Sequence, residues 1–371
     1  MKVLHICSTY IDRPFYKTMF DSLSKLGVDN VVYVPRWSDK QTDDNVFVVS
    51  RKFNKFEKLL YWGEQRYIYN DIVSRIAVDN IDCVHVHRIL YGGYAALQLK
   101  KKYGIPYIVA IRNSDIYGFM RNIGIYRRHC VDIMLNATKV VFLSHSYKKY
   151  VLEKYVSKKD RDKVERKSSV VTNGIDPIFL NNIRNNFETA ERNSKRIRLI
   201  CVAEIDKNKN SKTLIQACKV LLGKGYNVEL ILLGRIVNRN VYNKAISNNF
   251  VKYLGVKPKR ELIDVLRKSD VFVMPSIHES FGLVYAEAMT QGIPVVYTRG
   301  QGFDGQFKEG EVGYSVNCLD SKEIADKVEL ILSDYNNISA RCIENSQRYS
   351  WDNINKIYKE IYDQSMSKSR Y

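Results

Sequence analysis

The residues best placed to do chemistry lie in one segment, VFVMPSIHESFGLVYAEAMTQGIPVV, at positions 271–296. Its apolar run ends at Pro275 and predicts a buried strand, a polar loop continues to Gly282, and an apolar run from Leu283 predicts a helix. The first turn of such a helix presents free backbone N–H groups and the positive end of the helix dipole, which together favour an anion. Gly282 has no Cβ, so a ligand can approach that backbone closely.

Two carboxylates accompany this turn. Glu279 lies in the polar loop, and Glu287 lies one turn beyond Leu283 inside the apolar run LVYAEAM. A carboxylate among apolar side chains is costly unless it has a polar partner, and the hydroxyl groups of a sugar are such partners. The alternative interpretation of a single glutamate in such a helix is an exposed surface position.

The surrounding elements predict an α/β fold. Short apolar runs alternate with helix-length segments, as in parallel sheets that are covered on both faces. The polar stretch before Arg198 lacks an apolar stripe and indicates a linker. We expect two doubly wound, Rossmann-like domains that face each other across a cleft, with ligands at the carboxyl ends of the strands. The first domain covers 1–180 and is completed by a C-terminal helix at 350–371, the linker covers 181–197, and the second domain covers 198–349.

The phrase H-E-S-F-G-L, with a second glutamate eight residues after the first, resembles the donor-site motif of family 4 glycosyltransferases, which are retaining enzymes of GT-B fold. Other segments are similar to the same family: TNGIDPIFL (172–180), AEIDKNKNSKTLIQA (203–217) and YSWDNINKIYKEIY (349–362). The resemblance implies that the second domain binds a nucleotide diphosphate sugar, with UDP as the expected carrier, and that the first domain binds the acceptor.

The resemblance also implies roles for single residues. Lys209 matches the phosphate-binding lysine of the family, and its ammonium group would balance the diphosphate. Glu279 is expected to bind sugar hydroxyls and to support an oxocarbenium-like centre, whereas Glu287 is expected to bind the ribose. With no obvious side-chain base, the departing phosphate would take the proton of the acceptor. The other residues expected to contact the donor are Ser280, Phe281, Gly282 and Leu283.

Two positions depart from the family pattern. Glu204, counted here among the donor-binding residues, stands where the family often has an arginine, and Arg235 or Arg299 could supply the missing positive charge. Arg112 stands where the family often has a histidine, and an arginine cannot act as a general base. We keep Arg112 as a candidate catalytic residue that holds a phosphate or acceptor group; the alternative is a structural ion pair with Asp115.

No metal ion or other cofactor is expected. The seven scattered cysteines of the chain lack metal-ligand spacing and indicate thiols in a reducing cytoplasm. His85 and His87 lie on the same face of a predicted strand. Because no third ligand is apparent from the sequence, packing is the favoured interpretation of the two histidines.

The net charge of +19 is unevenly placed, because residues 1–200 hold 35 basic and 20 acidic side chains and residues 201–371 hold 24 and 20. This asymmetry predicts an anionic partner for the first half. Segments 51–62 and 147–159 combine lysines with aromatic residues at helical spacing, which predicts binding to an anionic membrane surface. The alternative is that both apolar stripes face the core of the domain. No stretch approaches the ~20 apolar residues of a membrane-spanning helix, so we expect a cytoplasmic protein, peripheral on the inner face of the cell membrane.

These observations predict a metal-independent glycosyltransferase of the hexosyltransferase type. It would move a sugar, with retention, from a UDP-sugar to a glycan or lipid-linked glycan in bacterial-type polysaccharide or glycoconjugate synthesis. The first alternative is a nucleotide-sugar epimerase or a phosphorylase of the same fold. The second is a nucleic-acid-binding protein, suggested by the charge alone; since no recognisable binding module is present, no nucleic acid partner is expected.

Overall fold

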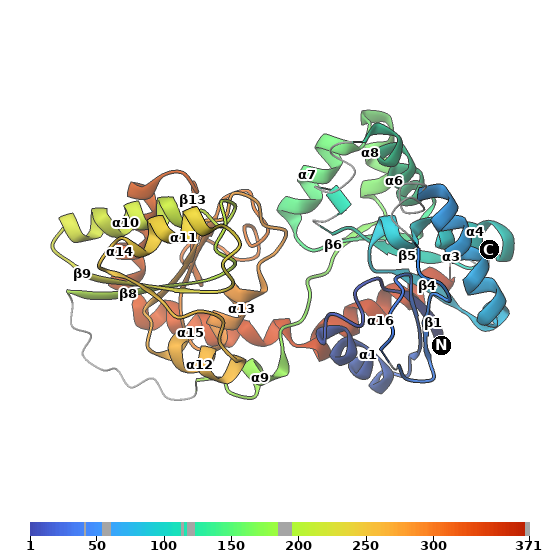
Figure 1. Cartoon of the computed structure of the whole chain (residues 1–371), viewed down its shortest axis with the longest axis horizontal. Coiled ribbons are helices and arrows are strands. Elements are labelled where there is room, and N and C mark those ends of the chain that lie inside the picture. Colours follow the sequence, from blue (N-terminus) through green and yellow to red (C-terminus); the bar gives the residue numbers. More distant parts are fainter. Residues whose placement is uncertain (41, 54–60, 113–114, 117–122, 185–194, 368–371) are drawn as a thin grey trace. The chain divides into compact units, whose positions relative to one another are not determined.

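The computed structural model describes the chain except for residues 41, 54–60, 113–114, 117–122, 185–194 and 368–371 (Figure 1). The chain divides into two compact units, which are described separately below. The first comprises Met1–Leu143, Lys148–Gly174 and Trp351–Tyr371, and the second comprises Ser144–Tyr147 and Ile175–Ser350. Most of the predicted linker at 181–197 lies outside the described residues.

The first unit contains a sheet of seven parallel strands in the order β3-β2-β1-β4-β5-β6-β7. β1 lies inside the sheet and pairs with β2 on one side and β4 on the other, with His5 in register with His85. The strands are nearly continuous apolar runs because helices cover both faces of such a sheet. They are β1 (Lys2–Ile6), β2 (Asp29–Val34), β3 (Val46–Val48), β4 (Cys83–Val86), β5 (Tyr107–Ala110), β6 (Lys139–Phe142) and β7 (Ser168–Val170).

The helices of the first unit include one from the far end of the chain. Helix α16 (Trp351–Ser367) packs beside α1 (Phe15–Lys25), and both contribute to the core on one side of the sheet (Figure 1). The indole of Trp351 covers Gly174, where an added Cβ would lie 2.5 Å from the ring. The other helices are α3 (Tyr61–Arg75), α4 (Ile89–Tyr103), α6 (Gly124–Asn136), α7 (His145–Tyr155) and α8 (Lys158–Glu165).

The second unit repeats this architecture with six parallel strands in the order β10-β9-β8-β11-β12-β13. Its strands are β8 (Arg196–Val202), β9 (Asn227–Leu233), β10 (Val251–Tyr253), β11 (Val271–Met274), β12 (Val295–Thr298) and β13 (Gly313–Val316). Its helices are α9 (Pro177–Leu180), α10 (Ser211–Gly223), α11 (Arg239–Ile246), α12 (Lys259–Arg267), α13 (Leu283–Thr290), α14 (Ser321–Ser333) and α15 (Tyr335–Ser346). Helix α9 packs against α12 and α13, which explains why the division falls after Gly174 and not at residue 180.

The two parallel sheets with their covering helices confirm the predicted α/β class of two Rossmann-like domains. Helices α6, α8, α9, α11 and α15 were not expected from the sequence. Helix α9 is only four residues long, and in the other four the polar residues obscure the apolar stripe. In the described part of the chain, no helix has both the length and the apolar character needed to cross a membrane.

The expectation that α7 presents an apolar stripe to lipid is wrong. Val151 and Tyr155, which belong to that stripe, are buried, with 0% and 5% of their surface exposed. These residues of the stripe therefore pack inside the protein, and the exposed residues of the helix are His145, Lys149, Glu153 and Lys154. In the second segment, Phe53 is also buried, and residues 54–60 lie outside the described part of the chain.

Candidate active site

The loop after β11 is fixed at both ends by hydrogen bonds to the sheet. The hydroxyl of Tyr285, on α13, donates to the carbonyl of Met274 at the end of β11, over 2.6 Å. The hydroxyl of Thr298, at the end of β12, donates to the carbonyl of Ser276 over 2.7 Å. The predicted strand, polar loop and helix are therefore held at the carboxyl edge of the second sheet, where ligands bind in folds of this type.

The start of α13 has no side-chain cap. Its N-cap residue is Gly282, with φ at +85°, a conformation that residues with a side chain rarely adopt. A Cβ at this position would lie 2.6 Å from the ring of Tyr285, so packing requires the glycine as well. Among the described residues, nothing accepts a hydrogen bond from the backbone N–H groups of Leu283 and Val284. These donors remain available to an anionic ligand.

Lys209 and Glu279, 70 positions apart in the sequence, meet beside this turn. The Lys209 ammonium donates to Glu279 Oε2 over 2.6 Å, and both side chains are mostly buried. The other carboxylate oxygen of Glu279 accepts from the backbone N–H of Ser280, over 3.1 Å. On the other side, the backbone N–H of Lys209 donates to Asp206 over 2.8 Å. The structure thus brings together the cation and the carboxylate that the sequence analysis selected separately.

A second loop supports the first. The side-chain oxygen of Gln301 accepts from the backbone N–H of Glu279 over 2.9 Å, and the N–H of Gly302 donates to the Glu279 carbonyl over 2.8 Å. A Cβ at position 302 would lie 2.3 Å from the backbone nitrogen of Phe281, so the two loops pack backbone against backbone. Sequence reasoning assigned no role to Gln301, and no signal in the pattern around it indicates this contact.

Glu287 lies in a more apolar environment than Glu279. Burial raises the pKa of its carboxyl group from 4.5 to about 7. The ammonium of Lys259 opposes this rise in pKa, and the carboxylate of Asp176 adds to it. Lys259 is itself bonded to Asp176, so its charge is shared. Within the described chain the carboxylate of Glu287 has no hydrogen-bond or ion-pair partner of its own.

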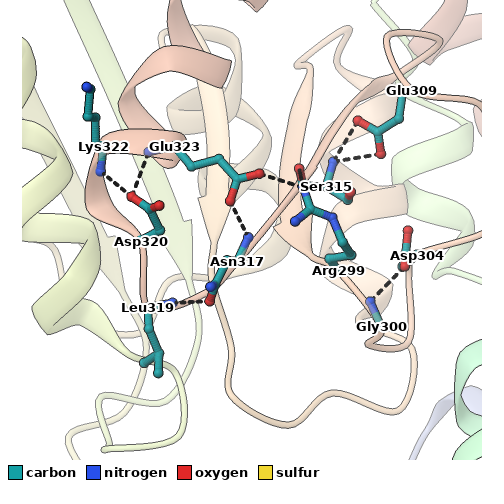
Figure 2. Close-up of polar contacts among 10 residues, drawn as sticks. All are labelled: Arg299, Gly300, Asp304, Glu309, Ser315, Asn317, Leu319, Asp320, Lys322 and Glu323. Carbon is teal, nitrogen blue, oxygen red and sulfur yellow. Dashed lines mark hydrogen bonds and ion pairs between the residues drawn. The ribbon is translucent and has the colours of Figure 1, made fainter.

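The structure also distinguishes the two arginines proposed to compensate for Glu204. Arg235, directly after β9, donates to the Glu204 carboxylate over 2.6 Å. The two residues occupy neighbouring strand ends, which the parallel bridge between Ile205 and Ile236 holds in register. Arg299 instead bonds to Glu323 over 2.5 Å and to the carbonyl of Ser315 over 3.3 Å (Figure 2).

Arg112, in the first unit, is bound by neutral oxygen atoms. Its guanidinium donates to the carbonyl of His87 over 3.3 Å and to the side-chain oxygen of Asn173 over 3.2 Å. The alternative interpretation of Arg112, a structural ion pair with Asp115, is wrong, because the Asp115 carboxylate does not pair with the Arg112 guanidinium. One oxygen of Asp115 accepts from the backbone N–H of Arg112, and the other lies 3.8 Å from Nε of Arg88. Arg112 therefore keeps a positive charge that no carboxylate in the described chain pairs with directly.

A third histidine joins the two recognised in the sequence. One ring nitrogen from each of His5, His85 and His87 lies within 4.8 Å of the others, and all three side chains are fully buried. Nδ1 of His5 lies 3.1 Å from Nε2 of His87, its Nε2 lies 2.8 Å from the side-chain oxygen of Asn30, and Nδ1 of His85 lies 2.7 Å from the hydroxyl of Tyr362.

This histidine cluster is the set of described residues that could hold a metal ion, but four of its six ring nitrogens already lie within hydrogen-bond distance of a partner in the protein. The rings of His85 and His87 are stacked, with their centroids 3.9 Å apart. Burial lowers the pKa of all three rings, and the charge of Arg112 lowers the pKa of His85 and His87 further. A divalent cation would sit in this apolar core with no carboxylate ligand in the cluster. We interpret the cluster as a hydrogen-bonded network within the core.

Comparisons with known proteins agree with this geometry. Residues 16–179 match the family model described as Glycosyltransferase Family 4, and residues 182–349 match the one described as Glycosyl transferases group 1. The capsular polysaccharide biosynthesis glycosyltransferase CapM of Staphylococcus aureus is 26% identical over 293 residues, which cover 75% of this chain and 76% of CapM. The D-inositol 3-phosphate glycosyltransferase of Corynebacterium urealyticum is 37% identical over 115 residues, 30% of this chain and 27% of that protein.

Solved structures show the same fold at low sequence identity. Sucrose-phosphate synthase from Thermosynechococcus elongatus has a TM-score of 0.75 and 16% identity, with coverage of 99% of this chain and 100% of the other. HepE from Anabaena, in complex with UDP and glucose, has a TM-score of 0.68 and 16% identity, with coverage of 98% and 99%.

The fold of the two units and the matches to the two family models therefore define a glycosyltransferase of GT-B fold, the class of enzyme that transfers sugars from nucleotide sugars. The chain belongs to the family 4 glycosyltransferases.

Proposed function

We propose that the protein transfers a sugar from a UDP-sugar to a glycan or lipid-linked glycan, with retention of configuration and without a metal ion. The observation that carries this proposal is the Lys209–Glu279 ion pair at the uncapped start of α13. It provides a cation and free N–H donors for a diphosphate, beside a carboxylate for the sugar. The similarity to a structure titled as a complex with UDP and glucose supports UDP, and the name of CapM supports a polysaccharide product.

In this mechanism the positive charge of Lys209 and the N–H donors of Phe281, Gly282 and Leu283 stabilise the charge that develops on the departing diphosphate. Donor binding draws Lys209 toward phosphate and releases the Glu279 carboxylate for the sugar hydroxyls and the cationic anomeric centre. Glu287 accepts hydrogen bonds from the ribose. The departing phosphate then takes the proton of the acceptor hydroxyl on the same face of the sugar, and the new glycosidic bond forms as the bond to phosphate breaks.

The test is acceptor-dependent release of nucleotide from a panel of nucleotide sugars. Transfer predicts release of UDP only when a glycan acceptor is present, unchanged by a chelator, with the anomeric configuration of the product equal to that of the donor by NMR. Conversion of the donor without acceptor would identify an epimerase, and a requirement for inorganic phosphate would identify a phosphorylase. An inverted product would contradict the retaining mechanism, and loss of activity with chelator would contradict metal independence.

We also propose that the first unit docks on an anionic membrane surface, where a lipid-linked acceptor would lie. The exposed lysines of α7, including Lys149 and Lys154, supply charge, at about 1 kcal/mol per basic residue near such a surface. Trp62 and Ile125 are exposed at 43% and 58% and supply apolar contacts. Co-sedimentation should require anionic vesicles and weaken with salt. Equal binding to neutral vesicles would contradict this role.

A further inference from the structure

The second unit has a cavity that the proposed transfer reaction does not use. Helices α10 and α11 pack beside each other (Figure 1). The cavity lies between them and has a volume of about 550 Å³. A cavity of this size accommodates a small molecule. Its lining includes four lysines: Lys207, Lys212, Lys219 and Lys244.

These four lysines, which we call the lysine groove, are not neutralised by the protein. Within the described part of the chain none of their ammonium groups has a hydrogen-bond or ion-pair partner, and the lining holds one carboxylate, that of Asp206. That carboxylate already accepts the backbone N–H of Lys209. By contrast Lys224, one residue after α10, is paired with both Asp326 and Glu329. Neighbouring ammonium groups without counter-charges repel one another, and a bound anion reduces this repulsion.

The floor of the lysine groove is apolar and its walls carry amides. Ile215 and Ala245 are buried at 6% and 1% exposure, and Val241 lies one turn before Ala245 on the same face of α11. Gln216, on α10, and Asn248, two residues after α11, also line the cavity. The side-chain nitrogen of Asn248 already donates to the carbonyls of Lys244 and Ala245, so its side-chain oxygen is the atom offered to a ligand. Charge around an apolar floor, with amides within the same cavity, suits a ligand that has a phosphate, a ring and hydroxyl groups.

We propose that the lysine groove binds a small phosphorylated molecule of the sugar phosphate or nucleoside monophosphate class. Its phosphate lies among Lys207, Lys212 and Lys244, its ring covers the apolar floor, and its hydroxyl groups bond to the amides. The lining includes neither Lys209 nor either of the two glutamates Glu279 and Glu287, so this is a second site. It adjoins the donor site, because Asp206 in its lining accepts the backbone N–H of Lys209.

Calorimetry on the full-length protein tests this assignment, with glucose 6-phosphate, AMP and unphosphorylated glucose as probes at low ionic strength. At least one phosphorylated probe should bind, and glucose should not. The double variant Lys212→Gln/Lys244→Gln should bind that probe about tenfold or more weakly, since hydrogen bonds to charged groups carry this much affinity. The matched control Lys252→Gln/Lys268→Gln removes two exposed lysines of the same unit outside the cavity and should bind normally.

The outcomes separate this site from the donor site. If Lys209→Ala weakens the probe and the groove variant does not, the probe occupies the donor site and the assignment is wrong. If the groove variant and the control variant weaken binding of the probe equally, the binding is non-specific electrostatic attraction, which also overturns the proposal. The same holds if neither phosphorylated probe binds at millimolar concentration. Because all four substituted lysines are exposed, melting curves should show that these variants fold normally.

Discussion

Replacing Glu287 by glutamine should stabilise the protein above neutral pH while it impairs donor binding. The carboxyl group has a pKa of about 7 in the folded protein and 4.5 as its ordinary value. A group whose folded pKa is raised contributes its full stability below its unfolded pKa, and this stability is lost as the pH rises through the folded value. Full ionisation therefore costs about 3 kcal/mol, at about 1.4 kcal/mol for each pH unit between the two pKa values.

Urea unfolding of the wild type and Glu287→Gln measures this directly. The variant should be more stable by about 3 kcal/mol near pH 8.5 and by about 1 kcal/mol or less near pH 5, with the change between pH 4.5 and 7. A difference that does not vary with pH, or a variant less stable at high pH, would refute the reasoning.

The affinity for donor should show the opposite trend. The ribose hydroxyls donate to an ionised carboxylate, so the wild type should bind a UDP-sugar more tightly as the pH rises through about 7. The diphosphate diester of the intact donor does not titrate in this range, which makes it a better probe than free UDP. Glu287→Gln should bind more weakly above pH 7 and lose this pH dependence, measured by calorimetry.

Three further predictions concern the site and its support. Lys209→Ala and Glu279→Ala should each reduce turnover about 10²-fold or more in a transfer assay, and near-normal turnover of both variants would remove the pair from the site. Lys209→Ala should also lower the affinity for UDP, measured by calorimetry. Gly302→Ala should destabilise the second unit by about 1–3 kcal/mol in urea unfolding, because its Cβ overlaps the backbone at Phe281; an unchanged midpoint would show that the loops separate freely. Trp351→Ala should destabilise the first unit by about 3–5 kcal/mol in urea unfolding, because the side chain is buried. The control Trp62→Ala removes an exposed tryptophan, and an equal loss of stability in this control would argue against a specific packing role for Trp351.

The sequence predicts those features that depend on local pattern. The strands are visible because buried parallel strands are continuous apolar runs, and the Lys209, Glu279 and Glu287 positions are visible through a motif. Contacts between segments distant in sequence are not encoded in this way. His5 is an ordinary residue of an apolar strand until the parallel register places it opposite His85. The periodicity of α7 identifies its apolar face but cannot tell whether protein or lipid covers that face.

The choice of the arginine that pairs with Glu204 also depends on contacts between segments that are distant in the sequence. Glu204 and Arg235 lie 31 positions apart, and only the pairing of β8 with β9 makes them neighbours. Arg235 and Arg299 look alike in the sequence, because Arg235 follows the predicted strand at 228–234 and Arg299 is the last residue of the predicted strand at 294–299. Their difference arises from Glu323, on the helix after β13, which binds Arg299.

The packing of α16 against α1 has a consequence for synthesis on the ribosome. The core of the first unit includes Trp351, Ile354 and Tyr358, so its apolar surface near Tyr16 and Phe20 stays uncovered until the last part of the chain has emerged. The second unit contains no segment from beyond Ser350 and can close earlier. The order of folding would then reverse the order of translation, and the nascent first unit would depend longest on protection from aggregation.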